Sequence, residues 1–92
     1  MKKIAVYPSF LHSVEKLTSQ EKILLRKSLE SLNIFLVSGK APFGFRFRKL
    51  GENKYEFRVD LRLRVIATED REFFNLVLVG GHDEIRQYLK NN

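Results

Sequence analysis

KLGENKYEFRVDLRLRVI, residues 49–66, has the pattern of two β-strands joined by a short connection. Apolar residues alternate with charged ones in both halves, which is the period-two pattern of a half-buried strand. One face of this pair is apolar and can pack against helices. The other face carries one carboxylate and four cations: Lys54, Glu56, Arg58, Arg62 and Arg64. Because unpaired charge is costly to dehydrate, we expect this face to remain open, either to solvent or to a polyanion.

The composition indicates one small domain, residues 1–92. The chain has a hydrophobic fraction of 43% and eight Phe, enough for a core of its own. No stretch approaches the ~20 apolar residues of a membrane helix, and the N-terminus lacks the apolar run of a signal peptide. We therefore expect a cytoplasmic protein. With no Cys and two His, disulfides and thiolate sites are excluded, and we expect neither a metal nor another cofactor.

The charge balance favours an anionic partner. The formal net charge is +6 and the sequence pI is about 9.8. Nucleic acid is the first candidate for such a chain, and an acidic protein would explain the same charge.

A strand and a helix are predicted at the N-terminus. Residues 3–7, KIAVY, form a candidate strand that Pro8 ends, because proline cannot donate a ladder hydrogen bond. Ser9 can then cap a helix that continues through Leu17.

A longer helix is predicted from about Ser19 to Val37. Thr18 and Glu21 have the spacing of a capping box, and Gly39 is placed to end the helix in a left-handed conformation. Two amphipathic helices so close in sequence form an α-hairpin. A sheet is the obvious surface against which they can bury their apolar stripes.

The remaining segments complete the predicted fold. Residues 43–48, FGFRFR, resemble a strand or extended segment whose three Phe belong to the core or to a partner contact. Residues 73–79, FFNLVLV, form the most apolar strand and should lie at the centre of the sheet. Short turns predict an antiparallel meander of the last three strands, and His82 begins a short C-terminal helix. The order β-α-α-β-β-β-α predicts an α+β fold, with two N-terminal helices packed on a small, mostly antiparallel sheet.

Several motifs in this order resemble those of a known family. They are Phe-x6-Leu in the first helix, Lys-Leu-Gly at 49–51, Tyr-Glu-Phe-Arg-Val at 55–59, Leu-Arg-Val-Ile at 63–66 and Gly-Gly-His-Asp-Glu-Ile at 80–85. The chain resembles the RelE/ParE superfamily of toxins from toxin–antitoxin pairs. The resemblance implies a ribosome-dependent mRNA endonuclease that inhibits translation, with the ribosome, mRNA and a cognate antitoxin as partners. The alternatives are a ParE-like inhibitor of DNA gyrase, or a degenerate relative that only binds nucleic acid or an antitoxin.

The resemblance also implies four catalytic positions. Arg58 matches a basic position of the central strand, and Arg64 matches the family's most regular arginine. His82 stands where members carry His or Arg, and Tyr88 stands where some carry a functional aromatic. Glu56 departs from the family, because some nucleases have a lysine there.

These residue types suit metal-independent RNA cleavage by the 2′-hydroxyl. The reaction needs a base, an acid and cations that stabilise the charge developing on phosphorus. An imidazole can give or take the proton, and guanidinium groups bind phosphate oxygens at two points. Each residue also has a structural alternative: His82 as a helix cap, the two arginines as ion partners of carboxylates, and Tyr88 as a core aromatic.

Further basic residues are candidate contacts to the RNA backbone, which supply affinity without reading sequence. A plain solvated basic edge would give the same pattern. The candidates are Arg46, Arg48, Lys49, Lys54 and Arg62.

Overall fold

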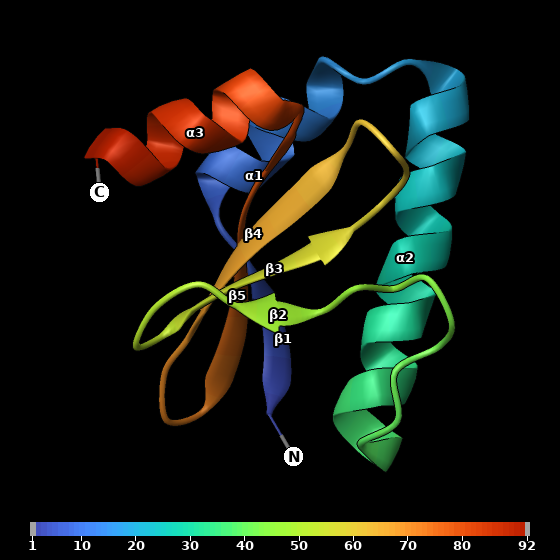
Figure 1. Cartoon of the computed structure of the whole chain (residues 1–92), viewed down its shortest axis with the longest axis vertical. Coiled ribbons are helices and arrows are strands. Elements are labelled where there is room, and N and C mark those ends of the chain that lie inside the picture. The colour runs from blue at the N-terminus through green and yellow to red at the C-terminus, as the bar shows by residue number, and fades with distance from the viewer. Residues whose placement is uncertain (1, 92) are drawn as a thin grey trace.

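The computed structural model describes residues 2–91, which form three helices and one five-stranded mixed sheet (Figure 1). The strands are β1 (Lys3–Val6), β2 (Arg48–Lys49), β3 (Lys54–Arg58), β4 (Arg64–Glu69) and β5 (Phe73–Gly80). The helices are α1 (Pro8–Glu15), α2 (Ser19–Ser38) and α3 (His82–Asn91). Within this part of the chain, no helix combines the length and the apolar composition that a membrane span requires.

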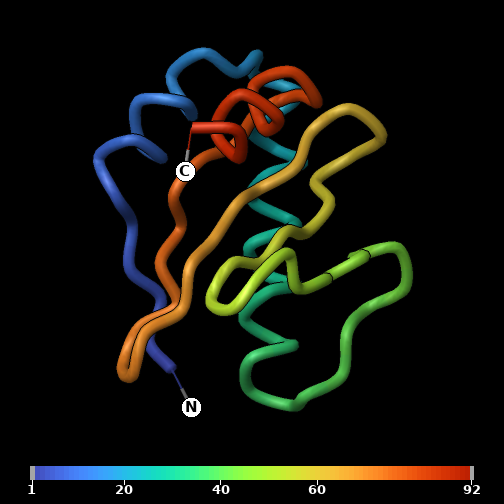
Figure 2. The backbone as a smooth tube through the Cα atoms, turned by 60° about the vertical axis from the view of Figure 1, so that its left-hand side comes forward, coloured from blue at the N-terminus to red at the C-terminus, as the bar shows by residue number. Residues whose placement is uncertain are grey.

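The sheet has the strand order β1-β5-β4-β3-β2. Strands β3, β4 and β5 form the predicted antiparallel meander. Strand β5 is an interior strand, between β1 and β4, but the central strand of the five is β4. Strand β1 pairs with β5 in parallel, with Lys3 opposite Phe73. Figure 2 shows β1 beside β5, so two segments that are far apart in the sequence are joined in one sheet.

Helix α1 begins two residues earlier than the sequence indicated. Pro8 occupies the first turn and Tyr7 is the N-cap, so the prediction that Ser9 caps this helix is wrong. The Ser9 hydroxyl instead donates to the carbonyl oxygen of Val77 at 2.6 Å, and the Ser13 Oγ accepts from the Val79 N–H at 3.1 Å. Two serines one helical turn apart therefore satisfy backbone groups of β5 beyond the end of β1.

Helix α2 follows the sequence prediction closely. The Thr18 Oγ1 accepts from the Glu21 N–H at 3.1 Å, and the Glu21 carboxylate accepts from the Thr18 N–H at 2.8 Å, which completes the capping box. At the other end, Gly39 has a φ of 77° and its N–H donates to the Phe35 carbonyl oxygen. These two signals fix the length of the helix.

The sheet is covered on one face by α1 and α2 and on part of the other by α3 (Figures 1 and 2). The larger core cluster joins Phe10 of α1 and Leu32 of α2 to Phe57 and Val65 of the sheet. On the other face, Ile85 of α3 packs with Ile66 and Val77. The sheet face that carries the cations is thus less open than the strand pattern alone suggested, because α3 packs on its apolar residues Ile66 and Val77.

Candidate functional site

The aromatic residues of the segment before β2 determine which side of the sheet its arginines face. Phe45 is buried, and the Phe47 ring lies 4.6 Å, centroid to centroid, from Phe35 of α2. Because these rings enter the core, Arg46 and Arg48 are directed to the opposite side of the sheet. Arg46 has a φ of 55°, a left-handed conformation that costs a non-glycine residue free energy. The expected extended segment is therefore irregular, with only Arg48–Lys49 paired as a strand.

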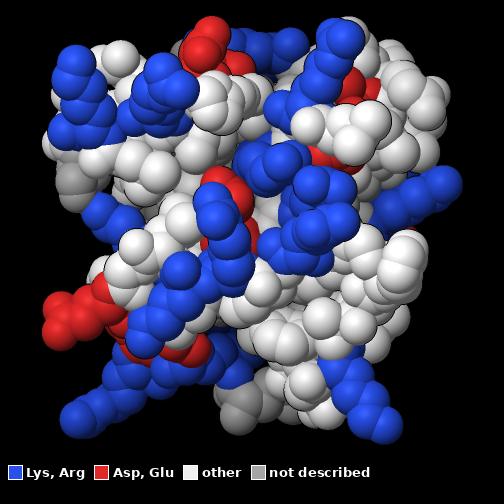
Figure 3. Space-filling model, in the orientation of Figure 1, with Lys and Arg blue, Asp and Glu red and all other residues white. Residues whose placement is uncertain are grey.

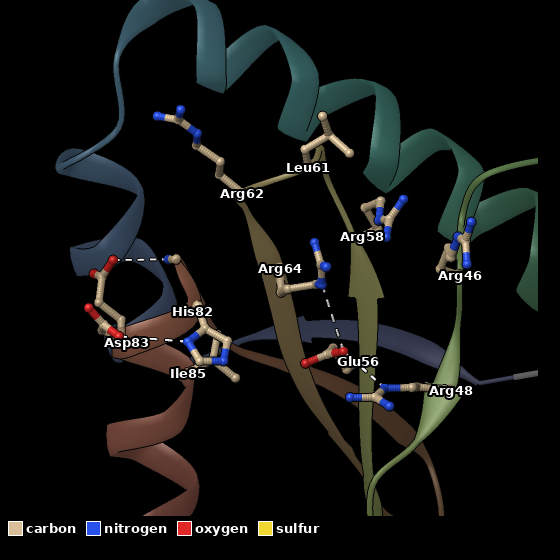
Figure 4. Close-up of a pocket in the computed structure, with 12 residues that line it drawn as sticks. Arg46, Arg48, Glu56, Arg58, Leu61, Arg62, Arg64, His82, Asp83 and Ile85 are labelled. Carbon is tan, nitrogen blue, oxygen red and sulfur yellow. Dashed lines mark hydrogen bonds and ion pairs between the residues drawn. The ribbon is translucent and has the colours of Figure 1, made fainter.

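A cleft of about 750 Å³ opens between this segment, the strands β3 and β4 and the start of α3 (Figure 4). The residues that line it are Arg46, Arg48, Glu56, Arg58, Leu61, Arg62, Arg64, Gly81, His82, Asp83, Glu84 and Ile85. Among these lining residues, five guanidinium groups face three carboxylates, so positive charge is in excess. Figure 3 shows the same concentration of Lys and Arg across the middle of this face.

Most of the site residues named from the sequence meet in this cleft. Three of the four catalytic candidates line it, as do three of the five candidate RNA contacts. In Figure 4, His82 lies on one side, Arg46 and Arg48 lie on the other, and Arg64 lies between them. Groups that are far apart in the sequence thus surround one concavity.

Three of the named residues lie outside the lining of the cleft. Lys49 pairs with Tyr55 across the strands, and alternation along β2 directs it away from the face that carries Arg48. The Nζ of Lys54 lies 5.8 Å from the centroid of the Tyr88 ring. Tyr88 packs against the Ile66–Val77–Ile85 cluster, and burial, with a smaller contribution from Tyr7, raises the pKa of its phenol. A phenol with a raised pKa holds its proton more firmly.

Arg64 is fixed at two points. Its Nη1 donates to the carbonyl oxygen of Asp60 at 2.9 Å, and its Nε lies 3.8 Å from the Glu56 carboxylate. The side chain is only 27% exposed, so its position is restricted by its neighbours. The Asp60 carboxylate accepts from two backbone N–H groups of the β3–β4 connection, which holds in place the carbonyl oxygen that accepts from Arg64.

Arg58 lies directly opposite Arg64 in the β3–β4 register. Its Nε is buried and, within residues 2–91, has no hydrogen-bond partner. Buried donors are normally paired, so this nitrogen has an unsatisfied hydrogen-bonding capacity. Because the Nε itself is inaccessible, a contact from Arg58 to an anion in the cleft would be made by other atoms of its guanidinium group.

Glu56 is the buried carboxylate of the cleft. Its Oε1 accepts from the Nε of Arg48 at 3.1 Å and is the atom nearest to Arg64. Ion pairing with a carboxylate was the structural alternative for both Arg58 and Arg64. Glu56 is such a partner for Arg64, and Arg48 is a further partner that alternation alone did not suggest.

His82 is the first residue of α3 and is strongly exposed, with a side-chain exposure of 76%. Its Nδ1 lies 3.6 Å from the Asp83 carboxylate. The helix is capped by a different contact, because the Glu84 carboxylate accepts from the Gly81 N–H at 3.0 Å. The imidazole is therefore not needed to cap the helix and faces the cleft, where it can exchange protons with a ligand.

Comparisons with known proteins identify the fold. No family model matches the sequence, and a search of curated proteins gave no match either. Solved structures match over most of the chain. A copper-bound mutant toxin from Helicobacter pylori has a TM-score of 0.67 at 17% identity, covering 92% of this chain and 99% of that one. The YafQ toxin in the Escherichia coli DinJ–YafQ complex has a TM-score of 0.67 at 13% sequence identity. The match covers 92% of this chain and 98% of that one.

The RelB–RelE antitoxin–toxin complex from Methanococcus jannaschii gives a TM-score of 0.67 at 10% identity, covering 91% of this chain and 96% of that one. This chain has the fold of these toxins. The RelE-like α+β architecture expected from the sequence is confirmed.

The cleft combines the elements of phosphate chemistry. Guanidinium groups can bind a phosphodiester from several sides, and an exposed imidazole can transfer a proton at the rim. Within residues 2–91, no group of three or more His, Cys, Asp or Glu side chains is arranged to hold a metal ion. The sequence did not identify Leu61, an apolar side chain that is 83% exposed at the rim, because a single leucine in a turn carries no pattern.

Proposed function

We propose that this chain is the toxin of a toxin–antitoxin pair and cuts messenger RNA on the ribosome without a metal ion. The observation that carries the proposal is the convergence of five arginines and His82 on one cleft. The RelE-type fold supports it, because solved structures with this fold include the toxins of the DinJ–YafQ and RelB–RelE complexes.

In the proposed reaction, the 2′-oxygen attacks the adjacent phosphorus and the bond to the 5′-oxygen breaks. The products are a 2′,3′-cyclic phosphate and a 5′-hydroxyl end. Arg64 and Arg58 bind the non-bridging oxygens, whose negative charge increases in the transition state. His82 transfers a proton at the 2′-oxygen or at the leaving 5′-oxygen. Tyr88 has no role in this proposal, because its ring lies outside the cleft.

Arg46, Arg48 and Arg62 bind the RNA backbone on either side of the cut. They line the cleft without lying at its centre, and they are exposed. Contacts of this kind supply affinity that depends on salt and carries no sequence reading. The ribosome and its message then determine where the cut falls.

We propose a cytoplasmic location, since the substrate is a translating ribosome, and an acidic antitoxin as the neutralising partner. The excess positive charge of the chain suits such a partner. Co-expression with the product of a neighbouring gene should restore growth and yield a stable complex. Cationic toxins of the gyrase-inhibiting class would be neutralised in the same way, so cleavage needs its own test.

The deciding experiment is expression of the chain alone, followed by mapping of RNA 5′ ends. We expect growth arrest, a stop in translation and new ends within codons of translated messages. Loss of DNA supercoiling with intact message would identify a gyrase inhibitor instead, and no arrest would identify a degenerate relative.

Three variants locate the chemistry. Arg64→Ala should slow cleavage by about 10²–10³-fold, as expected for loss of one charge-stabilising donor. His82→Ala should slow it by about 10²–10⁴-fold, as expected for loss of a general acid or base. Arg71→Ala is the matched control, because it removes an exposed arginine from the β4–β5 turn, away from the cleft. Full activity of both cleft variants would refute the site.

A further inference from the structure

The cleft contains a buried acid where the bound ligand is expected to be anionic. The Glu56 side chain is only 10% exposed and lies on the same sheet face as Arg58 and Arg64. A carboxylate there lowers the positive field and costs free energy to bury. Such a residue requires a compensating role.

The strand register indicates that role. Arg58 and Arg64 are directly opposite one another in the β3–β4 register, and like charges in that arrangement repel. Glu56 is opposite Ile66, so it is the diagonal neighbour of Arg64. Its carboxylate faces the Nε of Arg64 at 3.8 Å, so its negative charge offsets part of the repulsion between the two guanidinium groups.

The contacts of Arg64 complete the constraint. Its Nε faces Glu56 at 3.8 Å, and its Nη1 donates to the Asp60 carbonyl oxygen at 2.9 Å. Within the described chain no hydrogen bond engages its Nη2, which remains available to a ligand. The Arg48 Nε donates to the same Glu56 Oε1 at 3.1 Å and so holds the carboxylate in place.

We infer that Glu56 is a positioning residue, which orients the Arg64 guanidinium for the scissile phosphate and does not itself exchange a proton. This inference rests on the proposed nuclease function. A positioning role predicts opposite effects on RNA binding and on the rate of the chemical step. Removal of the Glu56 charge should leave RNA binding as strong as before or stronger, while the chemical step becomes slower.

The experiment compares Glu56→Gln with the parent on programmed ribosomes, under single-turnover conditions. We expect the cleavage rate at saturation to fall by about 10²-fold, the usual effect of a misplaced catalytic group. Affinity for a 2′-deoxy analogue of the message, which cannot be cut, should be unchanged or higher. Glu56→Asp keeps the charge and should recover part of the rate.

Glu72→Gln is the matched control, because it makes the same change of charge in the exposed β4–β5 turn. It should leave the cleavage rate unchanged. A second readout is the Nε–H resonance of Arg64 in the NMR spectrum of the free protein, which should shift and broaden in Glu56→Gln and remain in place in Glu72→Gln.

Three results would overturn the inference. They are a Glu56→Gln rate within about threefold of the parent, a loss of rate matched by an equal loss of analogue binding, or an unchanged Arg64 resonance. If the parent chain cuts no message, the nuclease proposal fails by itself. The Arg64 resonance then still decides whether Glu56 holds that guanidinium.

Discussion

Replacement of Ser13 by alanine should destabilise the protein more than the removal of a single oxygen atom suggests. Ser13 is buried, and its Oγ accepts from the Val79 N–H at 3.1 Å while donating to the Phe10 carbonyl oxygen at 2.8 Å. In Ser13→Ala the Val79 N–H loses its partner inside the core. An unsatisfied buried donor costs about 1–3 kcal/mol. Alanine recovers roughly 0.5 kcal/mol through its better helix propensity, so the net loss should be about 1.5 kcal/mol.

Ser9→Ala is the matched control for this change. Ser9 lies one turn earlier on α1 and donates to the Val77 carbonyl oxygen, but it is exposed, so water can replace its hydroxyl. Its loss should cost below about 1 kcal/mol. At roughly 4–8 °C per kcal/mol for a domain of this size, Ser13→Ala should unfold about 6–12 °C below the parent.

The assay is urea and thermal unfolding followed by far-ultraviolet circular dichroism, since the chain has no Trp. Native-state hydrogen exchange gives a residue-level reading, because the Val79 amide should lose protection in Ser13→Ala alone. Equal unfolding midpoints for the two serine variants, or an amide of Val79 that remains protected, would refute the assignment of Ser13 as its partner.

Three more predictions follow from particular contacts. Arg46 has a left-handed backbone, so the Arg46→Gly variant should be about 1 kcal/mol more stable than Arg46→Ala in urea unfolding. Both variants lose one phosphate contact, so the slope of log affinity for RNA against log salt concentration should be lower by about 1 in each. Tyr88→Phe keeps the packed ring and removes the hydroxyl, so cleavage should stay within about twofold of the parent; a tenfold loss would place the phenol in the reaction. Hydrogen bonds from the Phe73 N–H, then from Asn75, hold the pKa of Asp70 below its usual value. The ionised Asp70 carboxylate therefore stabilises the fold fully above its unfolded-state pKa, and this contribution is lost as the pH falls through its folded-state pKa. The difference in unfolding free energy between Asp70→Asn and the parent should therefore vanish in acid. A difference that persists in acid would contradict the assignment.

The local signals in the sequence were sufficient for much of the fold. The capping pair Thr18 and Glu21 and the terminator Gly39 fix α2, because each acts through backbone groups within a few residues. Alternation also identified the face that carries Arg58 and Arg64. Such signals depend only on near neighbours along the chain.

Features that depend on distant partners could not be predicted in this way. Nothing in KIAVY indicates that β1 pairs in parallel with β5, since strand patterns do not name their partners. Ser9 is of a residue type that often caps helices, yet its hydroxyl donates to the carbonyl oxygen of Val77, 68 residues away in sequence. The place of Tyr88 outside the cleft likewise depends on how α3 rests on Ile66 and Val77, which periodicity does not report.

The parallel pairing of β1 with β5 has a consequence for the order of events during synthesis. The first strand to leave the ribosome must wait for nearly the last segment of the chain before its ladder can form. His82 belongs to α3, which is made later still. A nascent chain therefore has no assembled cleft until β5 and α3 have been synthesised and have left the ribosome, so any activity of the cleft has to wait for both segments.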